Sequence, residues 1–398
     1  MTEMRHPLDP IFKPRSIAVI GASRKKGSIG WEILHNIVEY EFNGKVFPVN
    51  PHAEVIHSIK CFPSVLDIPD PVDLAIIVVP KEEVLRVVDE CGQKGVRGLV
   101  VITAGFKETG PAGLEREQKL VEKIRHYGMR MIGPNCMGII NTDPTVRLNA
   151  TFAPTRPLPG RIGFTSQSGA LGAAILNMAE RLGLGFSMFV SMGNKADVSG
   201  NDLLQYWEDD PHTDVILMYL ESFGNPRKFT QLARRVTKKK PIIAVKAGRT
   251  AAGARAASSH TGALAGLDIA TEALLEQCGV LRALSIEDLF DLAMAFVYCP
   301  IPRGNRVAIL TNAGGPAIMA TDACVNFGLK IAELAPRTRA QLRARLPEEC
   351  TIENPVDLIA SADAATYRFA LDLLLADENV DAAIVIFGPP IMVSPHEI

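Results

Sequence analysis

Short runs rich in valine and isoleucine alternate with amphipathic stretches of helical length along this 398-residue chain. In the first third of the sequence, strands are predicted over 16–20, 46–49, 74–79, 99–103 and 129–132. Helices are predicted between them over 29–40, 82–92 and 113–127, where apolar residues recur at helical spacing. This alternation is typical of parallel sheets that are covered by helices on both faces. We therefore predict an α/β protein with doubly wound folds.

Two proline-rich segments, 153–160 and 299–304, interrupt the alternation and predict linkers. With 47% hydrophobic residues, a chain of this length can bury two or three cores of about 100 to 150 residues each. Three lobes are therefore expected, over residues 1–145, 158–298 and 303–398.

The second and third lobes begin with the same sequence pattern, because residues 161–169 align without a gap with residues 306–314. Each segment predicts a strand, a small polar turn with an amide side chain and a glycine, and then a helix. Further on, 380–387 resembles 213–220, but the second lobe continues to about residue 298 whereas the third stops at 398. We expect the third lobe to be incomplete, as in a fragment of a longer polypeptide.

Charge and composition exclude several classes of partner. The formal net charge is −2, and basic residues are dispersed except at 238–240, so nucleic acid and anionic membranes are not expected partners. No apolar run approaches the roughly 18 residues of a membrane span, and residues 1–10 lack a signal-peptide apolar region. A cytoplasmic location is therefore expected. The seven cysteines are scattered without metal-ligand spacing, which predicts reduced thiols and no metal site.

The turn over 21–30 follows a strand and opens a helix, so its N–H groups and the helix dipole would face an anion such as a nucleotide diphosphate. A nicotinamide cofactor is not expected, because the turn is not G-x-G-x-x-G and the second strand ends at 48–51 without an acidic residue for a ribose hydroxyl. Instead, Arg24, Lys25 and Lys26 suit a ligand with an extra phosphate, which coenzyme A carries on its ribose. The alternative is that these three residues form only a solvated loop.

Three further turns, at 78–80, 102–106 and 133–136, fall at the carboxyl ends of predicted strands. Each alone is ordinary turn chemistry, since proline and glycine often follow a strand. The carboxyl edge is nevertheless where an open parallel sheet binds its ligand. Together, these turns are predicted to line one crevice.

The turns at 166–169 and 312–315 carry no basic side chain and suit a small anion held by backbone amides and helix N-termini. His260 is the one histidine among eight that lies in a loop of small residues, over 258–266. Such a residue could carry a large charged group such as a phosphoryl group. The alternative is that it is a solvated loop residue.

Five motifs in order along the chain resemble those of the NDP-forming (ADP-forming) acyl-CoA synthetases, which are related to succinyl-CoA synthetase. They lie at 21–23, 133–136, 166–171, 258–262 and 311–316. The resemblance covers essentially the whole chain and implies the alpha-subunit-like part, in which a Rossmann-like CoA-binding lobe precedes two flavodoxin-like lobes. It also implies that ATP or ADP, with Mg, binds to an ATP-grasp domain, for which we find no signature in this sequence.

The resemblance also implies roles for individual residues. Coenzyme A is expected against the first lobe at Gly21, Ala22, Ser23, Arg24, Lys25, Asn50, Pro80, Thr103, Ala104, Gly105, Phe106 and Asn135. His260 is expected to take a phosphoryl group from an acyl phosphate and present it to ADP, while Glu221 hydrogen-bonds the imidazole and favours its nucleophilic tautomer. The phosphoryl group is expected between helix starts at Ser166, Ser168, Gly169, Gly314 and Gly315.

The implied function is that of an acid–thiol ligase, which interconverts acyl-CoA, phosphate and ADP with a carboxylic acid, coenzyme A and ATP. Its expected partner is an ATP-grasp domain or beta subunit, in an oligomer. The alternative is a non-catalytic, coenzyme-A-sensing module like the regulatory region of some protein lysine acetyltransferases. Degraded phosphohistidine machinery would favour that alternative, but His260 and Glu221 are both present. Cys136 could be interpreted as a catalytic thiol, although the pathway does not need one.

Overall fold

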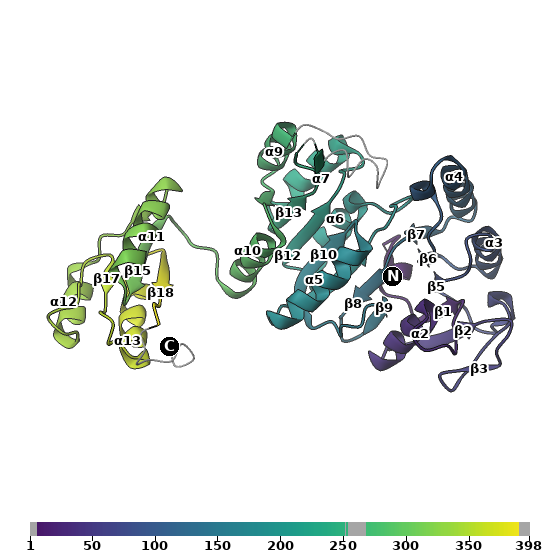
Figure 1. Cartoon of the computed structure of the whole chain (residues 1–398), viewed down its shortest axis with the longest axis horizontal. Coiled ribbons are helices and arrows are strands. Elements are labelled where there is room, and N and C mark those ends of the chain that lie inside the picture. Colours follow the sequence, from purple (N-terminus) through teal and green to yellow (C-terminus); the bar gives the residue numbers. More distant parts are fainter. Residues whose placement is uncertain (1–5, 251, 254–267, 390–398) are drawn as a thin grey trace, which may run out of the picture. The chain divides into compact units, whose positions relative to one another are not determined.

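The computed structural model describes residues 6–250, 252–253 and 268–389. The chain divides into two compact units, residues 1–299 and 300–398, which are described separately (Figure 1). His260, the predicted phosphoryl carrier, lies outside the described residues.

The first sheet of the larger unit is parallel, in the order β2-β1-β5-β6-β7. Its strands are β1 (Ser16–Ile20), β2 (Lys45–Val49), β5 (Leu74–Ile77), β6 (Gly98–Val101) and β7 (Arg130–Ile132). The connecting helices are α2 (Ile29–Glu39), α3 (Val84–Lys94) and α4 (Pro111–His126). Smaller elements are β3 (Val55–Ile56), β4 (Ile59–Lys60), η1 (Val65–Asp67) and η2 (Lys107–Thr109). The predicted strands and helices of this lobe are confirmed, with ends that differ by a few residues.

Burial explains why these strands were visible in the sequence. Every residue of β1, β5 and β6 is buried, and after Ser16 in β1 and Gly98 in β6 each strand is a continuous apolar run rather than an alternating one. The order of the strands reverses between β1 and β5, which makes their carboxyl ends the switch point of this sheet.

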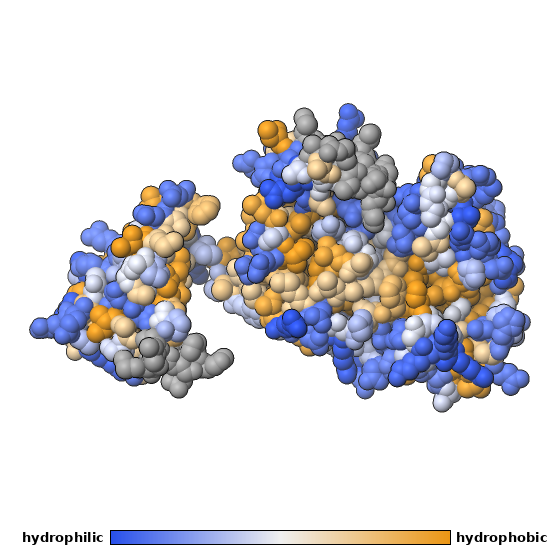
Figure 2. Space-filling view, in the orientation of Figure 1, coloured by the Kyte–Doolittle hydropathy of each residue, from blue (hydrophilic) through white to orange (hydrophobic). Residues whose placement is uncertain are grey.

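The second sheet combines parallel strands with an antiparallel hairpin, in the order β14-β13-β12-β10-β11-β8-β9. Its parallel strands are β10 (Pro159–Ser166), β11 (Phe186–Ser191), β12 (Val215–Leu220), β13 (Ile242–Lys246) and β14 (Leu281–Ala283). The helices are α5 (Gly169–Arg181), α6 (Gly200–Glu208), α7 (Pro226–Val236), α9 (Asp268–Gln277) and α10 (Ile286–Tyr298). The switch point of this sheet lies between β10 and β12. Ala170 and Ala174 of α5 are exposed, and Figure 2 shows apolar surface over the middle of the larger unit.

The hairpin of β8 (Gly138–Asn141) and β9 (Leu148–Thr151) precedes the proline-rich linker but pairs with the second sheet, through β11. The chain therefore enters the second sheet before residue 145, where the sequence placed the end of the first lobe. The strands β8 and β9 thus form one edge of the second sheet.

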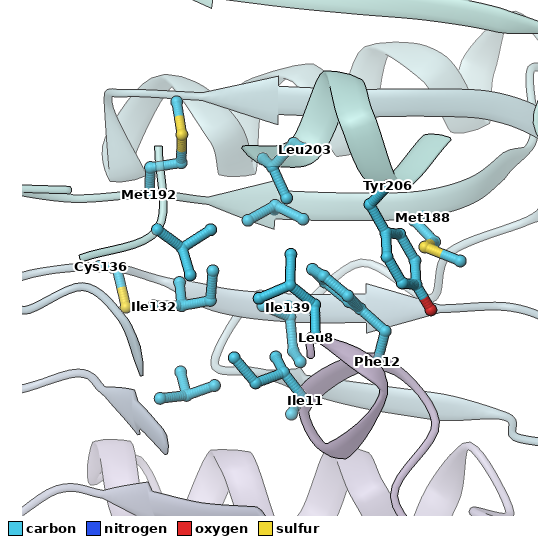
Figure 3. Close-up of a cluster of buried hydrophobic side chains, with 14 of the residues drawn as sticks. Leu8, Ile11, Phe12, Ile132, Cys136, Ile139, Met188, Met192, Leu203 and Tyr206 are labelled. Atoms are coloured by element: carbon cyan, nitrogen blue, oxygen red, sulfur yellow. The ribbon is translucent and has the colours of Figure 1, made fainter. Parts of the chain in front are cut away.

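One continuous core joins the two lobes of this unit (Figure 3). The short helix α1 (Asp9–Phe12) contributes Ile11 and Phe12, both fully buried among residues of both sheets. Phe12 packs against Tyr206 of α6, with ring centroids 4.9 Å apart, and the Tyr206 hydroxyl donates to Asp9 Oδ1 at 3.0 Å. This packing joins the two sheets in one unit.

The smaller unit is built around β15 (Arg306–Thr311), which pairs in parallel with three strands. They are β16 (Lys330–Ile331), β17 (Val356–Asp357) and β18 (Ala382–Ile386). The helices are α11 (Gly314–Asn326), α12 (Pro336–Arg345) and α13 (Ala364–Leu375).

The structure confirms the internal repeat at the level of hydrogen bonds. The amide of Ser168 donates to Ser166 Oγ at 3.1 Å, and the amide of Ala313 donates to Thr311 Oγ1 at 3.0 Å. In each lobe the hydroxyl of the strand's last residue also donates back to the same turn, which leads into a helix that starts at a glycine. The two turns therefore have the same local construction.

Candidate active site

A cavity of about 1250 Å³ lies in the larger unit, where the carboxyl ends of strands from both lobes meet. From the first lobe, it is lined by turns that follow β1, β5 and β6. From the second lobe, it is lined by 167–170 after β10, 193–195 after β11 and 221–222 after β12. Both switch points therefore open into one space, which can hold an extended ligand and the group that reacts with it.

The turn after β1 approaches its neighbours too closely for any side chain. Gly21 has φ +94°, and a Cβ placed there would lie 2.4 Å from the Val78 carbonyl oxygen. A Cβ at Gly30 would lie 2.1 Å from the Gly21 carbonyl oxygen, so the first turn of α2 sits directly against this turn. The hydroxyl of Ser28 donates to the Lys25 carbonyl rather than capping α2. The amino end of α2 is thus a suitable site for an anion such as a diphosphate.

The structure places the predicted coenzyme A residues in two groups. The cavity wall includes six of them, namely Gly21, Ser23, Pro80, Thr103, Ala104 and Asn135. The others lie behind or beside the wall: Ala22 and Phe106 are fully buried, and the Asn50 amide donates to the Ala22 carbonyl at 2.8 Å. Arg24 Nε donates to the Val55 carbonyl at 2.8 Å, Lys25 is exposed, and the Gly105 carbonyl accepts from Arg116.

In the second lobe, Gln167 holds the segment that carries Glu221. Its Oε1 accepts from the amides of Glu221 at 3.0 Å and Ser222 at 2.9 Å, and its Nε2 donates to the Ser222 carbonyl at 2.7 Å. Glu221 lies on the cavity wall at the end of β12, and Gly169 begins α5 on the same wall. Ser168 accepts from the Leu171 amide at 3.4 Å and caps α5.

The remaining phosphate residues occupy different places. Ser166 is fully buried and shapes the turn before α5. Gly314 and Gly315 begin α11 in the smaller unit, as the sequence predicted. Their role as a second phosphate cradle stays a prediction.

A polar network on the cavity wall was missed by the sequence analysis. The side-chain amide of Asn194 donates to Glu108 Oε2 at 2.6 Å and to Glu117 Oε2 at 2.8 Å. Lys107 Nζ donates to the backbone carbonyl of Asn194. Burial acts to raise the pKa of Glu108, but hydrogen bonds from Asn194 and from three backbone amides lower it overall. This network ties the first lobe to the loop after β11.

Lys195 lies in the same loop and was also missed. Its Nζ donates to the Ser222 carbonyl at 2.9 Å and to the Ser222 hydroxyl. Burial, with the nearby Lys107 charge, lowers the pKa of this ammonium to about 8, although Glu221 acts to raise it. The only signal in the sequence is a lysine in a Gly-Asn-Lys turn after a strand.

Cys136 lines the cavity but is not built as a nucleophile. Its side chain is 5% exposed, and Sγ donates to the Val101 carbonyl at 3.3 Å. Burial raises the pKa of the thiol to about 12, so the reactive thiolate is scarce at neutral pH.

Models of three domain families match the chain in succession. They are a CoA binding domain over residues 15–142, a succinyl-CoA ligase like flavodoxin domain over 159–296, and a Ligase-CoA domain over 307–397. The alpha subunit of ADP-forming acetate–CoA ligase II from Pyrococcus furiosus is 49% identical over 96% of this chain and 83% of its own length. The chain belongs to the ADP-forming acyl-CoA synthetases. It is the alpha-subunit-like part of these acid–thiol ligases.

Two other members of the family show how far the likeness extends. ADP-forming acetate–CoA ligase I of Archaeoglobus fulgidus is 46% identical over 96% of this chain, which spans 55% of that relative's length. A solved dinucleotide-forming acetyl-coenzyme A synthetase from Candidatus Korarchaeum cryptofilum, in complex with phosphate and ADP, matches with a TM-score of 0.93 at 42% identity. That match covers 98% of this chain and 83% of the solved chain. Within the described part of this synthetase chain, no helix is long and apolar enough to cross a membrane.

Proposed function

We propose that this chain forms the coenzyme-A-binding and phosphohistidine half of an acyl-CoA synthetase that interconverts acyl-CoA, phosphate and ADP with carboxylic acid, coenzyme A and ATP. The observation that carries the proposal is the cavity itself, since it joins the switch point of the CoA-binding lobe to that of the lobe with Glu221. A thioester held by the first lobe would thus lie beside the group that processes its phosphoryl product.

The chemistry divides into three balanced steps. A phosphate oxygen attacks the thioester carbonyl, the C–S bond breaks, and the coenzyme leaves as a thiol after taking a proton. A nitrogen of His260 then attacks phosphorus, the bond between phosphorus and the acyl oxygen breaks, and the carboxylate leaves. Finally, an ADP oxygen takes the phosphoryl group and restores the imidazole.

The residues on the cavity wall fit the first two steps. The tight turn at Gly21 and the start of α2 would bind the diphosphate of coenzyme A. The start of α5 at Gly169 would face the phosphoryl group, where a helix terminus stabilises negative charge by about 0.3–1 kcal/mol. Glu221 would accept a hydrogen bond from the imidazole of His260 and orient its nucleophilic nitrogen. Gly314 and Gly315, which begin the equivalent helix α11, would also bind a phosphoryl group.

The third step needs a nucleotide site, which we assign to an ATP-grasp domain or beta subunit that also holds Mg. We further propose that the enzyme works as an oligomer in the cytoplasm.

Phosphoryl transfer from labelled ATP tests the proposal. The chain, combined with an ATP-grasp subunit from a related ligase, is incubated with γ-labelled ATP, and acid-labile, base-stable label is measured on this chain. We expect label in the wild type and none in His260→Asn. The two proteins should bind coenzyme A with the same affinity. Label that survives His260→Asn would overturn the mechanism. Coenzyme A binding without any label in the complete wild-type enzyme would favour a sensing module instead.

A further inference from the structure

Two lysines, Lys107 and Lys195, supply the cationic side chains among the described residues that line the cavity. Lys107 is already matched, since its Nζ lies 3.7 Å from Glu117 Oε1 and also donates to the Asn194 carbonyl. Lys195 differs from it. Across the described ranges, no carboxylate lies within ion-pair distance of Lys195 Nζ, whose hydrogen bonds go to Ser222.

The backbone around Lys195 is held in an unfavourable conformation. Lys195 has φ +49°, in the left-handed region that side chains other than glycine seldom adopt. Its amide donates to the Met192 carbonyl at 3.0 Å, and the next amide, of Ala196, donates to the Gly133 carbonyl at 3.1 Å. A strained residue with a half-buried charge persists only where its surroundings determine it, and such residues concentrate at functional sites.

The position of the ammonium group follows from a short chain of hydrogen bonds. Lys195 Nζ bonds Ser222, and Ser222 bonds the side chain of Gln167 through both its amide and its carbonyl. Gln167 immediately precedes Ser168, the cap of α5. The ammonium therefore lies on the same wall as the amino end of α5 and adjacent to Glu221.

We propose that Lys195 Nζ binds the oxygens of the phosphoryl group as it passes from phosphate through the acyl phosphate to the histidine. This inference rests on the proposed function and adds a side-chain cation to a site that the sequence assigned to backbone amides alone. The acyl phosphate and the transition state of its cleavage both carry negative charge on these oxygens. A preorganised, partly buried ammonium stabilises that charge more than water does.

The charge of Lys195 should also be visible in the pH dependence of the reaction. The groups that act on it are Lys107, Glu221 and Lys246, and with burial they bring its pKa to about 8. In the free enzyme Lys195 is therefore a charged ammonium below about pH 8 and a neutral amine above it. We expect kcat/KM for phosphate to fall above that pH in the wild type, and this fall to be absent in Lys195→Met.

The test compares three variants in the complete enzyme, assayed as acyl-CoA-dependent phosphorylation of ADP. Lys195→Met removes the charge, and Lys195→Arg keeps it. Lys240→Met is the matched control, because Lys240 is also partly buried with a lowered pKa, yet its Nζ donates to the Trp207 and Asp210 carbonyls and it does not line the cavity.

We expect Lys195→Met to lower kcat/KM for phosphate at pH 7 by about 100-fold or more, with coenzyme A affinity within about threefold of wild type. Lys195→Arg should recover part of the loss, and Lys240→Met should match the wild type. A merely structural role would instead move coenzyme A affinity and kcat/KM for phosphate together in Lys195→Met. Normal phosphate kinetics in Lys195→Met, with His260 labelled, would overturn this inference alone. Absence of label on wild-type His260 would overturn the proposed function first.

Discussion

Gly21 and Gly27 lie in the same turn between β1 and α2 and both have positive φ, yet alanine should affect them very differently. At Gly27, with φ +81°, an added Cβ meets no atom of the described residues within 4 Å. At Gly21, with φ +94°, the added Cβ would lie 2.4 Å from the Val78 carbonyl oxygen. The pair therefore separates the cost of the backbone conformation from the cost of a clash at the switch point.

The magnitudes follow from these two contributions. The left-handed conformation costs an alanine about 1–2 kcal/mol, so Gly27→Ala should lose about 1 kcal/mol after the gain from a less flexible unfolded chain. Gly21→Ala bears the same cost and must also move β1 away from β5, where the Val78 amide donates to the Ile20 carbonyl at 2.8 Å. Overpacking of this kind adds about 1–3 kcal/mol, for a total of about 2–4 kcal/mol.

Tryptophan fluorescence during urea unfolding measures this loss of stability in the compact unit that contains both glycines. The chain has two tryptophans, Trp31 and Trp207, and both belong to the unit of residues 1–299. Coenzyme A affinity, from calorimetry, should fall at least about tenfold in Gly21→Ala and less than threefold in Gly27→Ala, because only the first substitution displaces the turn that lines the cavity. Equal losses of stability and affinity in the two variants would refute the reasoning.

Three further substitutions test the cavity wall. Asn194→Ala should destabilise the larger unit by about 2–4 kcal/mol, because Glu108 and Glu117 lose a buried donor; a urea-unfolding loss below about 0.5 kcal/mol would contradict this. Cys136→Ser should keep kcat within about threefold, and a loss above 100-fold would mean that the thiol is catalytic. Lys195→Met should gain up to about 3 kcal/mol at pH 7, since the pKa of the folded-state ammonium is about 8 against an ordinary 10.5. Burial of this charge penalises the folded state below about pH 8, so the gain should vanish above about pH 10.5, and a net loss at pH 7 would contradict it.

The sequence predicted those features that arise from local signals. A buried parallel strand such as β5 is apolar along its whole length, so such strands were visible in the sequence as apolar runs. The repeat was visible because Ser166 and Thr311 make the same turn hydrogen bonds and so occupy equivalent positions. The switch-point residues were found because glycine and proline are needed where strands end close together.

Features that depend on contact between lobes were not predictable in the same way. The hairpin of β8 and β9 has ordinary strand residues, and nothing local shows that it pairs with β11 of the next lobe. Within the first lobe, the sequence likewise did not show that Arg24 Nε donates to the Val55 carbonyl, a partner 31 residues away in the chain, and the role of Arg24 at the ligand stays a prediction. Lys195 reads in the sequence as part of a polar turn, and only the docking of that turn places it in the cavity.

Docking of the Lys195 loop also links the two halves of the proposed reaction. The backbone amide of Asn194 donates to the Pro134 carbonyl at 2.8 Å, and a Cβ at Gly193 would lie 2.3 Å from the Asn135 carbonyl oxygen. The segment that contributes Asn135 to the proposed coenzyme A side of the cavity is therefore the same segment that contacts the Lys195 loop on the proposed phosphoryl side. Because this contact has no space for an extra methyl group, a shift of the first-lobe turn must carry the loop with it. Coenzyme A that displaces Asn135 would thus also move the ammonium relative to α5, and this coupling needs only the packing of adjacent backbones.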